Sequence, residues 1–376
     1  MADTIELDGA QQSGSGTLVR FGVALASVLG RPLHVVRARA HRAKPGLRPQ
    51  HVAAIRAAAE LCAGRVDGVT VGATEFHFAP GPALRAGEFL WDIGTAGSAT
   101  MLALGVLPIA CLAAGPVSAR IRGGVFQDFA PSPHHLAQVL APLLAGCGVH
   151  VELSVARPGF LPGGAGEIDL RVRPAVRGLA ALDLCERGEL GEFSGVALSS
   201  HLEARGVSER MAATCEAALA AGGLQGRITR VHDQTAAQAG ASLAAWVGTT
   251  SGARFGADRA GAPRRSSEAI GRFVARSLLE DLRSGGTVDR HSADQLVIFA
   301  ALARGTSRFV AAQQTAHLAS NLWLIGLFGA RSRREGNRVE IDGLGLAPPA
   351  IRPFRRQRHV GRKDLRAARR DREPRG

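Results

Sequence analysis

The sequence has no apolar run long enough to cross a membrane and no stretch with the pattern of a secretory leader. No such run reaches the ~18 residues that a spanning helix needs, so we expect no membrane partner. The first ten residues, MADTIELDGA, lack a basic region followed by an apolar one. We therefore expect no secretory signal.

Cysteine is also scarce. The chain has five, which is an odd number, and no two of them form a CxxC pair. This pattern argues against both a disulfide framework and a zinc site. A reducing cytoplasm is the location we expect. The five cysteines are Cys62, Cys111, Cys147, Cys185 and Cys215.

Positive charge, by contrast, is abundant. The formal net charge is +14 over 376 residues, and residues 352–376 alone hold 11 Arg or Lys against 3 Asp or Glu. The rest of the chain carries about +6, which is still basic. We expect residues 351–376 to be a disordered basic tail, able to touch RNA phosphates without reading their sequence.

Helix-like and strand-like periodicity alternates along the first 182 residues, as in a chain of helices packed on mixed sheets. The order helix, strand, helix, strand, strand occurs twice, which indicates an α/β (α+β) fold. The predicted helices are 16–30, 48–64, 97–115 and 132–148. The predicted strands are 33–39, two within 66–81, 117–125, 149–155 and 166–174.

Two of these helices also match in sequence. PQHVAAI at 49–55 and PHHLAQV at 133–139 share Pro, His, an aliphatic residue, Ala and a second aliphatic residue. The offset of 84 residues indicates that a whole supersecondary unit has been duplicated. We expect a third copy in 266–286 through 292–305.

Residues 183–265 do not follow this order. They contain a predicted helix at 208–223 and predicted strands at 226–233 and 241–250. We interpret 183–265 as a smaller inserted α/β domain, with the Gly/Arg-rich segment 252–268 as the connection that leads out of it.

The segment TAHLASNLWLIGLF, residues 315–328, is typical of a buried helix except for His317 and Asn321. Residues four apart share one helical face. A core histidine with a hydrogen-bond partner explains this pair, and so does a histidine that carries chemistry. The segment alone leaves both interpretations open.

Basic residues cluster at a turn in RARAHRAKPGLRPQH, residues 37–51. Arg39, Arg42 and Lys44 come where a strand gives way to a Pro-Gly turn, and Gln50 follows. Guanidinium groups grip phosphate oxygens in a bidentate manner, so this cluster suits a polyphosphate or an RNA end. A solvated basic loop is the plain alternative.

Two further segments allow a binding interpretation and a structural one. LDGAQQSGSGTLVR, residues 7–20, is a Gly/Ser-rich loop that can present N–H groups to anions, although no GK[ST] follows it. DRHSADQ, residues 289–295, places His291, Asp294 and Gln295 at a helix start, where they can hold a ligand or act as caps.

In combination and order, these segments resemble the RNA 3'-terminal phosphate cyclase family over nearly the whole chain up to about residue 350. The similar stretches are LDGAQ with Arg20, RAKPGLRPQH, GTAGSAT (94–100), GFLPGGAGE (159–167), ADQL (293–296) and HLASN (317–321). The resemblance implies three repeated units, each of two helices on a four-stranded sheet, with a smaller inserted α/β domain. The core is then 1–182 and 266–350, and the insert is 183–265.

The resemblance also implies a reaction. Family members use ATP and Mg²⁺ or Mn²⁺ to convert an RNA 3'-phosphate into a 2',3'-cyclic phosphate through a covalent histidine–AMP, which here implies His317 as the nucleophile. Neutral imidazole is a competent nucleophile. The residues implied to bind the nucleotide are His291, Ser292, Ala293, Asp294, Gln295 and Leu104. Those implied to bind phosphate or RNA are Arg20, Arg39, Arg42, Gln50 and Asn321.

The chain departs from the family pattern at two positions. Ser13 stands where a metal-holding glutamate is usual, and Leu104 stands where a nucleotide-contacting glutamine is usual. Asp294 is then the candidate metal ligand that remains. Three hypotheses follow: an active cyclase, a non-catalytic cyclase-like RNA-binding protein, and an enzyme that transfers AMP to another terminal phosphate. The oligomeric state is left open.

Overall fold

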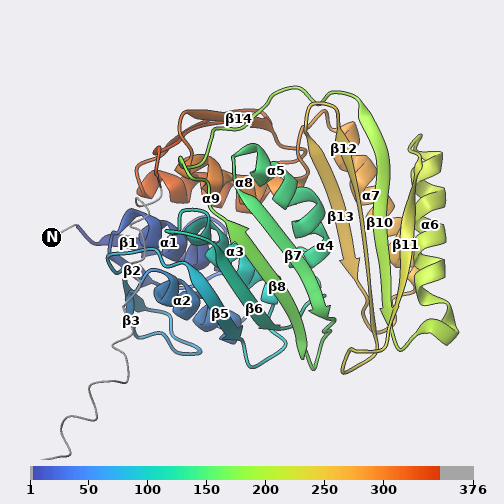
Figure 1. The fold of residues 1–376 in the computed structure, drawn as a ribbon, viewed down its shortest axis with the longest axis horizontal. Coiled ribbons are helices and arrows are strands. Elements are labelled where there is room, and N and C mark those ends of the chain that lie inside the picture. Colours follow the sequence, from blue (N-terminus) through green and yellow to red (C-terminus); the bar gives the residue numbers. More distant parts are fainter. Residues whose placement is uncertain (1–2, 348–376) are drawn as a thin grey trace, which may run out of the picture.

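The structure is a computed structural model that describes residues 3–347. These residues form four separate four-stranded sheets with helices packed against them (Figure 1). No helix in this range is both long and apolar enough to span a membrane. The tail predicted at 351–376 lies outside the described residues.

The first unit begins with a strand that the sequence analysis did not predict. Its elements are β1 (Ile5–Asp8), α1 (Gly16–Leu29), β2 (Leu33–Val36), α2 (Pro49–Leu61), β3 (Arg65–Asp67) and β4 (Phe76–Ala79). The sheet order is β1-β2-β4-β3, in which β1 runs parallel to β2 and the other pairs are antiparallel. Helix α1 begins after Ser15, whose side chain caps it, and ends at Gly30 in the left-handed conformation.

The second unit repeats this order of elements. It contains β5 (Gly87–Asp92), α3 (Ala99–Ala110), β6 (Val117–Gly123), a helical segment made of α4 (Pro133–His135), the π-helical turn η1 (Leu136–Leu140) and α5 (Ala141–Gly146), then β7 (His150–Arg157) and β8 (Gly166–Arg173). The sheet order β5-β6-β8-β7 matches that of the first unit. The sequence match between 49–55 and 133–139 therefore joins equivalent second helices.

The third unit is interrupted after its first strand. It contains β9 (Asp183–Leu184) and, more than a hundred residues later, α8 (Arg290–Leu302), β14 (Thr306–Val310), α9 (Ala316–Leu327), β15 (Arg331–Glu335) and β16 (Arg338–Asp342). Strand β9 pairs in parallel with β14, and the order β9-β14-β16-β15 is again the order of the first two units. The predicted α+β fold of three units on four-stranded sheets is confirmed.

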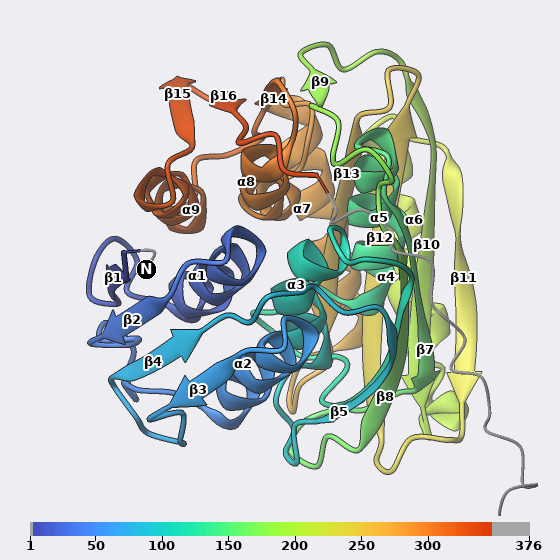
Figure 2. The same cartoon turned by 60° about the vertical axis from the view of Figure 1, so that its left-hand side comes forward.

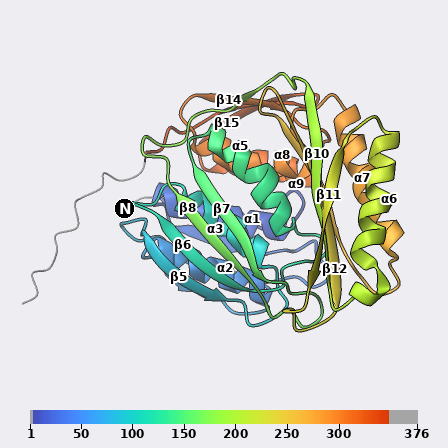
Figure 3. The ribbon, with the colours of Figure 1, turned by 45° about the vertical axis from the view of Figure 1, so that its right-hand side comes forward.

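The insert has a different topology. It contains β10 (Leu190–Ser200), η2 (Glu203–Arg205), α6 (Val207–Ala221), β11 (Gly226–Asp233), β12 (Gly240–Thr249), β13 (Arg254–Ala260) and α7 (Ser267–Arg283). Its sheet order is β11-β10-β12-β13, and α6 and α7 cover the outer face of this sheet (Figure 3). Side chains of both helices form a separate hydrophobic core with the sheet.

Two predictions about this region were wrong. Helix α7 was assigned to a third core copy at 266–286, but its apolar residues Ile270, Val274 and Leu278 belong to the core of the insert. The segment 252–268 was read as a connection, but it contains strand β13. The insert therefore extends from about β10 through α7, and β9, within the predicted insert, pairs with the third core sheet.

The helices of the three core units meet in the middle of the molecule. Helix α1 contacts α2, α3 and α9, and α8 contacts α9, while the core sheets lie outside them (Figure 2). This arrangement brings the N-terminal ends of α1, α2, α8 and α9 to one cavity that also reaches the insert.

Candidate active site

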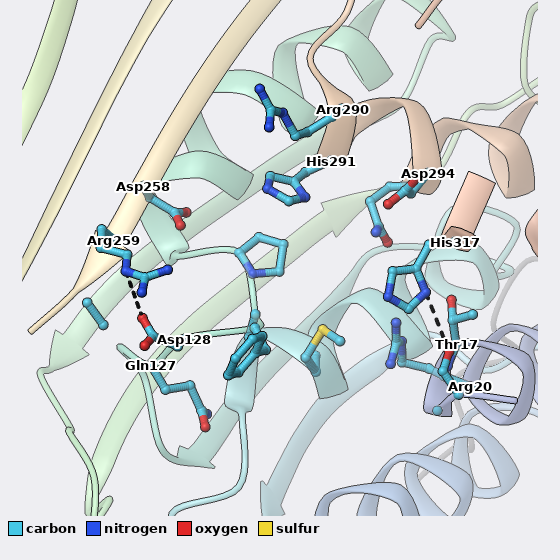
Figure 4. Close-up of a pocket in the computed structure, with 18 of the residues that line it drawn as sticks. Thr17, Arg20, Gln127, Asp128, Asp258, Arg259, Arg290, His291, Asp294 and His317 are labelled. Carbon is cyan, nitrogen blue, oxygen red and sulfur yellow. Dashed lines mark hydrogen bonds and ion pairs between the residues drawn. The ribbon is translucent and has the colours of Figure 1, made fainter. Parts of the chain in front are cut away.

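A cavity of about 610 Å³ lies where the core helices meet the insert (Figure 4). This volume is within the range typical of small-molecule sites. Its core wall comes from the starts of α1, α2, α8 and α9, the basic loop after β2 and the 127–131 loop. Its far wall comes from β13 and α7. Eight of the predicted site residues line it: Arg20, Arg39, Arg42, Gln50, His291, Asp294, Gln295 and His317.

His317 lies in the first turn of α9, which Thr315 caps by accepting a hydrogen bond from the N–H of Leu318 at 2.9 Å. Burial lowers the pKa of His317 to about 4, and the nearby Arg20 and Arg42 act in the same direction. The ring is therefore neutral at pH 7, with a free lone pair on one nitrogen. This geometry favours a chemical function over the core-histidine interpretation, because the ring lines the cavity wall.

A chain of three hydrogen-bonded serine hydroxyls leads to the ring of His317. The Oγ of Ser320 lies 2.8 Å from that of Ser13, which lies 3.0 Å from that of Ser15. The Oγ of Ser15 lies 3.4 Å from Nδ1 of His317. Hydroxyls both donate and accept, so this chain can hold the imidazole in one orientation whichever nitrogen carries the proton.

Arg20 is a buried arginine with an unpaired nitrogen. Its side chain comes from α1, only 6% of the residue is exposed, and its Nε has no hydrogen-bond partner among the described residues. Burial lowers the pKa of its guanidinium to about 10, which leaves it charged at pH 7. The aliphatic part of the side chain packs against Gly105, where an added Cβ would lie 2.6 Å from Cγ of Arg20. A buried charge without a partner favours an anionic ligand.

The basic loop between β2 and α2 brings Arg39 and Arg42 to the cavity. Arg39 has a φ of 58°, and its guanidinium donates to the carbonyl of Lys44 at 3.1 Å and to that of Gly46. These bonds hold the loop in a tight turn. The side-chain oxygen of Gln50 accepts from the N–H of Ser98 at 2.8 Å, so its amide nitrogen is left for a ligand.

His51 is a cavity residue that the sequence analysis did not assign to the site. Its Nδ1 accepts from the N–H of Arg48 at 3.1 Å, so the proton of the neutral ring lies on Nε2. Burial, reinforced by nearby arginines of which Arg39 is the first, lowers its pKa to about 3. An added Cβ on Gly16 would lie 2.4 Å from Nε2, so Gly16 leaves the space that this ring fills.

Asp294 is the only predicted metal ligand. It lines the cavity from α8 and accepts a hydrogen bond from Oγ1 of Thr315. Burial raises the pKa of its carboxyl group to about 7, and nearby Asp289 adds to this effect. A carboxylate whose ionisation is this unfavourable gains most from a cation beside it, which fits a divalent metal.

Asp289 and His135 form a buried ion pair that the sequence analysis did not predict. His135 Nε2 lies 3.3 Å from Oδ2 of Asp289, which also accepts from the N–H of Gly256 at 3.2 Å. Oδ1 of Asp289 accepts from the N–H of His291 at 2.9 Å. The pair lowers the pKa of Asp289 to about 2. It joins α4, α8 and β13, and thereby positions His291 in the cavity wall.

The insert supplies the opposite rim of the cavity. Arg259 on β13 lies 3.4 Å from Asp128 of the core (Figure 4). Arg265, which follows β13 and does not line the cavity, lies 2.7 Å from the same carboxylate. Phe129, beside Asp128, is fully exposed at this rim. Because the segment was interpreted as a connection, Arg259 was not predicted as part of the site.

Known sequences match this chain over most of its length. A profile of the RNA 3'-terminal phosphate cyclase family matches residues 11–332. The chain belongs to that family. Proteins named RNA 3'-terminal phosphate cyclase from Hyperthermus butylicus and from Methylococcus capsulatus are each 36% identical to it. They are aligned over 85% and 91% of this chain and over 90% and 95% of their own lengths.

Four of the residues that the resemblance assigned to ligand binding do not line the cavity of this family member. Leu104 is buried and packs with Leu107 and Leu136 in a small apolar space. Ser292 and Ala293 are fully buried, and the hydroxyl of Ser292 donates to Asp289 at 2.8 Å. These three residues have structural positions, and the structure does not bring them to the cavity.

Asn321 is the fourth. It is fully buried, its Nδ2 donates to the carbonyl of Asp294 at 2.7 Å, and its Oδ1 accepts from Oγ1 of Thr17 at 3.2 Å. Asn321 therefore joins α9 to α8 and α1. It does not line the cavity.

Proposed function

We propose that this protein uses ATP to convert the 3'-terminal phosphate of RNA into a 2',3'-cyclic phosphate. The observation that carries the proposal is a neutral histidine, His317, in the wall of a cavity that also holds the guanidinium groups of Arg20, Arg39 and Arg42. The names of the relatives, RNA 3'-terminal phosphate cyclase, support the same substrate.

The proposed reaction has three displacements at phosphorus. The unprotonated ring nitrogen of His317 attacks the α-phosphorus of ATP, and pyrophosphate leaves. An oxygen of the RNA 3'-phosphate then attacks the phosphorus of the histidine-bound AMP, which frees the imidazole and gives an RNA–AMP anhydride. Finally the neighbouring 2'-OH attacks the terminal RNA phosphorus, loses its proton and expels AMP.

The cationic residues fit the charge that develops in these steps. Phosphoryl and nucleotidyl transfer depend mainly on positioning and on offsetting charge on the oxygens around phosphorus. Arg20 is buried and fixed by packing, so its charge needs no reorganisation, whereas Arg39 and Arg42 come from a loop at the cavity edge. The orphaned Nε of Arg20 and Oε1 of Gln295 are polar atoms that a bound nucleotide would satisfy.

We also propose a divalent cation, Mg²⁺ or Mn²⁺, held by Asp294 together with the phosphates. When bound, such an ion would offset charge on the triphosphate and favour departure of pyrophosphate. The raised pKa of Asp294 supports this assignment. Ser13 stands where the family pattern has a glutamate, and a neutral hydroxyl does not supply the charge of a carboxylate. Asp294 would then be the one protein carboxylate that holds the ion. The cytoplasm is the location that we propose.

The second candidate is a cyclase-like protein that binds RNA without catalysis. The observations in its favour are Ser13 in the loop and Leu104 in an apolar space, where the family pattern has charged and polar residues. The neutral, cavity-lining His317 favours the enzyme.

The test is to incubate the full chain with α-³²P-ATP and Mg²⁺ or Mn²⁺ and resolve it on a denaturing gel. We expect an acid-labile, hydroxylamine-sensitive label that His317→Ala abolishes and that His150→Ala, a change of an exposed histidine on β7, leaves unchanged. RNA with a 3'-phosphate should then discharge the label and become resistant to phosphatase.

Other outcomes decide between the hypotheses. A label that RNA does not discharge would favour transfer of AMP to another terminal phosphate. If the protein is folded and binds RNA but takes no label with either metal, the result would favour the non-catalytic hypothesis.

A further inference from the structure

Helices α1 and α2 pack on one face of the first sheet (Figure 2). A pair of histidines lies on the other face, because the burial pattern of β2 and β4 alternates. In β2, Leu33 and Val35 are buried and His34 alternates with them. In β4, Phe76 and Phe78 are buried and His77 is exposed between them. The strands place His34 opposite His77, and the two rings stack with centroids 4.2 Å apart and planes 8° apart.

Carboxylates flank this pair on several sides. Glu75 Oε1 lies 2.9 Å from Nε2 of His34, and Glu6 Oε2 lies 4.0 Å from its Nδ1. The strand register also sets Asp67 of β3 opposite His77. One row of paired residues therefore crosses all four strands. It consists of Glu6, His34, His77 and Asp67, and Glu75 lies beside it.

The nitrogen and oxygen atoms of three of these side chains converge. One ligand atom each from His34, His77 and Glu75 lie within 4.8 Å of one another. The ion pair with Glu75 explains the position of the His34 ring. It does not explain that of His77, which has no hydrogen-bond or ion-pair partner among the described residues. Two stacked imidazoles would repel each other when protonated, whereas neutral imidazoles can share a cation.

We propose that His34, His77 and Glu75 form a site for a divalent transition metal, with Zn²⁺ as the representative ion. Two imidazole nitrogens and one carboxylate oxygen are ligands that Zn²⁺ takes readily, and water would fill the fourth position. Imidazole disfavours Mg²⁺ and Ca²⁺, so this site differs in chemistry from the ion proposed at Asp294.

The ligands can reach bonding geometry without a change of fold. Zn–N bonds of about 2.0–2.1 Å in a tetrahedron bring two ligating nitrogens to about 3.3 Å. Rotation of the exposed His77 ring and of Glu75, whose side chain is 63% exposed, supplies the required movement.

A metal here would connect β2 and β4 to a segment that supports the basic loop. Glu75 follows Thr74, whose carbonyl accepts from the N–H of Ala38 at 2.8 Å, and Ala73, whose carbonyl accepts from that of Leu47 at 2.9 Å. Ala38 and Leu47 are at the two ends of the loop that carries Arg39 and Arg42. We therefore expect the ion to stabilise this part of the first unit.

The test is a Zn²⁺ titration of the full chain, stripped with a chelator and free of ATP and RNA, followed by calorimetry and by competition with a chromophoric chelator. Because other histidines can bind Zn²⁺, the comparison is between the wild type and His77→Asn. We expect the variant to lose one Zn²⁺ equivalent, or to bind it at least tenfold more weakly, and to lose the rise in Tm that Zn²⁺ gives the wild type.

His150→Asn is the matched control. His150 is exposed on a strand and lies 3.1 Å from Glu152, but no second imidazole stacks on it. Its loss should leave the Zn²⁺ stoichiometry and affinity unchanged. Equal Zn²⁺ binding by the wild type and His77→Asn would overturn the proposal. Because His77 is exposed, its replacement leaves the packed face of the sheet intact.

Discussion

The Nδ1 atom of His317, on α9, lies 3.4 Å from the Oγ atom of Ser15, which caps α1. These two residues are about three hundred positions apart, and their contact joins the first core unit to the third. If Nδ1 carries the ring proton and donates it to Ser15, Nε2 keeps its lone pair for attack on phosphorus. Ser320 donates to Ser13 and Ser13 donates to Ser15, so the contact with His317 is the end of a chain of hydroxyls.

We predict that Ser15→Ala slows formation of the histidine–AMP label about tenfold, which corresponds to one hydrogen bond of about 1.4 kcal/mol. Ser15→Thr should retain most of the rate because it keeps the hydroxyl. The measurement is single-turnover labelling at saturating ATP, which separates the chemical step from binding.

Ser15 also caps a helix, so the control must remove a cap alone. Ser266 caps α7 in the same way, through a hydrogen bond from the N–H of Ala269, and lies outside the cavity lining. Ser266→Ala should label at the wild-type rate. If Ser15→Ala and Ser266→Ala slowed labelling equally, the effect of Ser15→Ala would come from helix stability alone.

The second prediction concerns Gly105, whose missing side chain makes room for Arg20. A Cβ there would lie 2.6 Å from Cγ and 3.0 Å from Cδ of Arg20, so Gly105→Ala must displace a buried guanidinium. A charge-assisted hydrogen bond is worth about 1.5–3 kcal/mol. We therefore expect the KM for ATP in the labelling reaction to rise at least tenfold while the fold is kept.

Gly326→Ala is the matched control, because Gly326 lies on the exposed side of α9 and a Cβ there meets nothing within 4 Å. This change should leave the KM unchanged and stabilise the helix by up to about 1 kcal/mol. An unchanged KM in Gly105→Ala would mean that Arg20 does not contact the bound nucleotide.

Local sequence patterns were sufficient for most helices of the core but not for the first strand of each unit. Strand β9 has two residues, and its partner β14 follows after the whole insert, so no local periodicity marks it. Helix α7 has a clear apolar face, but only the tertiary contacts with α6 show which core that face joins.

The same limit applies to the candidate site. The motifs placed His317 and Arg20 correctly at one cavity, whereas Leu104 lies on α3, which is buried on nearly all sides. An apolar helix of this kind has no polar face from which to infer orientation. The Asp289–His135 pair joins residues from two units, so it depends on a contact that spacing along the chain does not encode.

The third prediction concerns His51 and acid stability. Its pKa is lowered to about 3 in the folded protein, against about 6.5 in the unfolded chain, so the unfolded state takes up a proton first as the pH falls. The folded state therefore loses stability below pH 6.5. This histidine alone accounts for about 2 kcal/mol between pH 7.5 and pH 5, at about 1.4 kcal/mol per pH unit.

We expect His51→Gln to reduce this loss, because glutamine does not titrate and its side-chain oxygen can accept from the N–H of Arg48. Urea unfolding at pH 7.5, 6 and 5 measures the free energy of unfolding. The exposed His150→Gln variant should keep the wild-type slope. A His51→Gln slope equal to that of the wild type would contradict the prediction.

The last prediction concerns Asp294, whose folded pKa of about 7 lies far above the usual value for aspartate. Its ionisation costs the folded protein stability as the pH rises from about 4 to 7, since the unfolded chain ionises first. We expect Asp294→Asn, measured free of metal at pH 8, to be more stable than the wild type by up to about 4 kcal/mol, at about 1.4 kcal/mol per pKa unit. The amide oxygen can still accept the hydrogen bond from Thr315.

The same change should remove function. A divalent ion competes with the proton on Asp294, so Mn²⁺-dependent labelling of the wild type should rise with pH up to about 7 and then level off. Asp294→Asn should label weakly at every pH. Asp342→Asn is the control, because Thr306 donates to Asp342 at 2.8 Å in the same kind of pair on the exposed surface. If Asp294→Asn kept the pH dependence and the Mn²⁺ response of the wild type, Asp294 would be neither the titrating group nor a ligand of the ion.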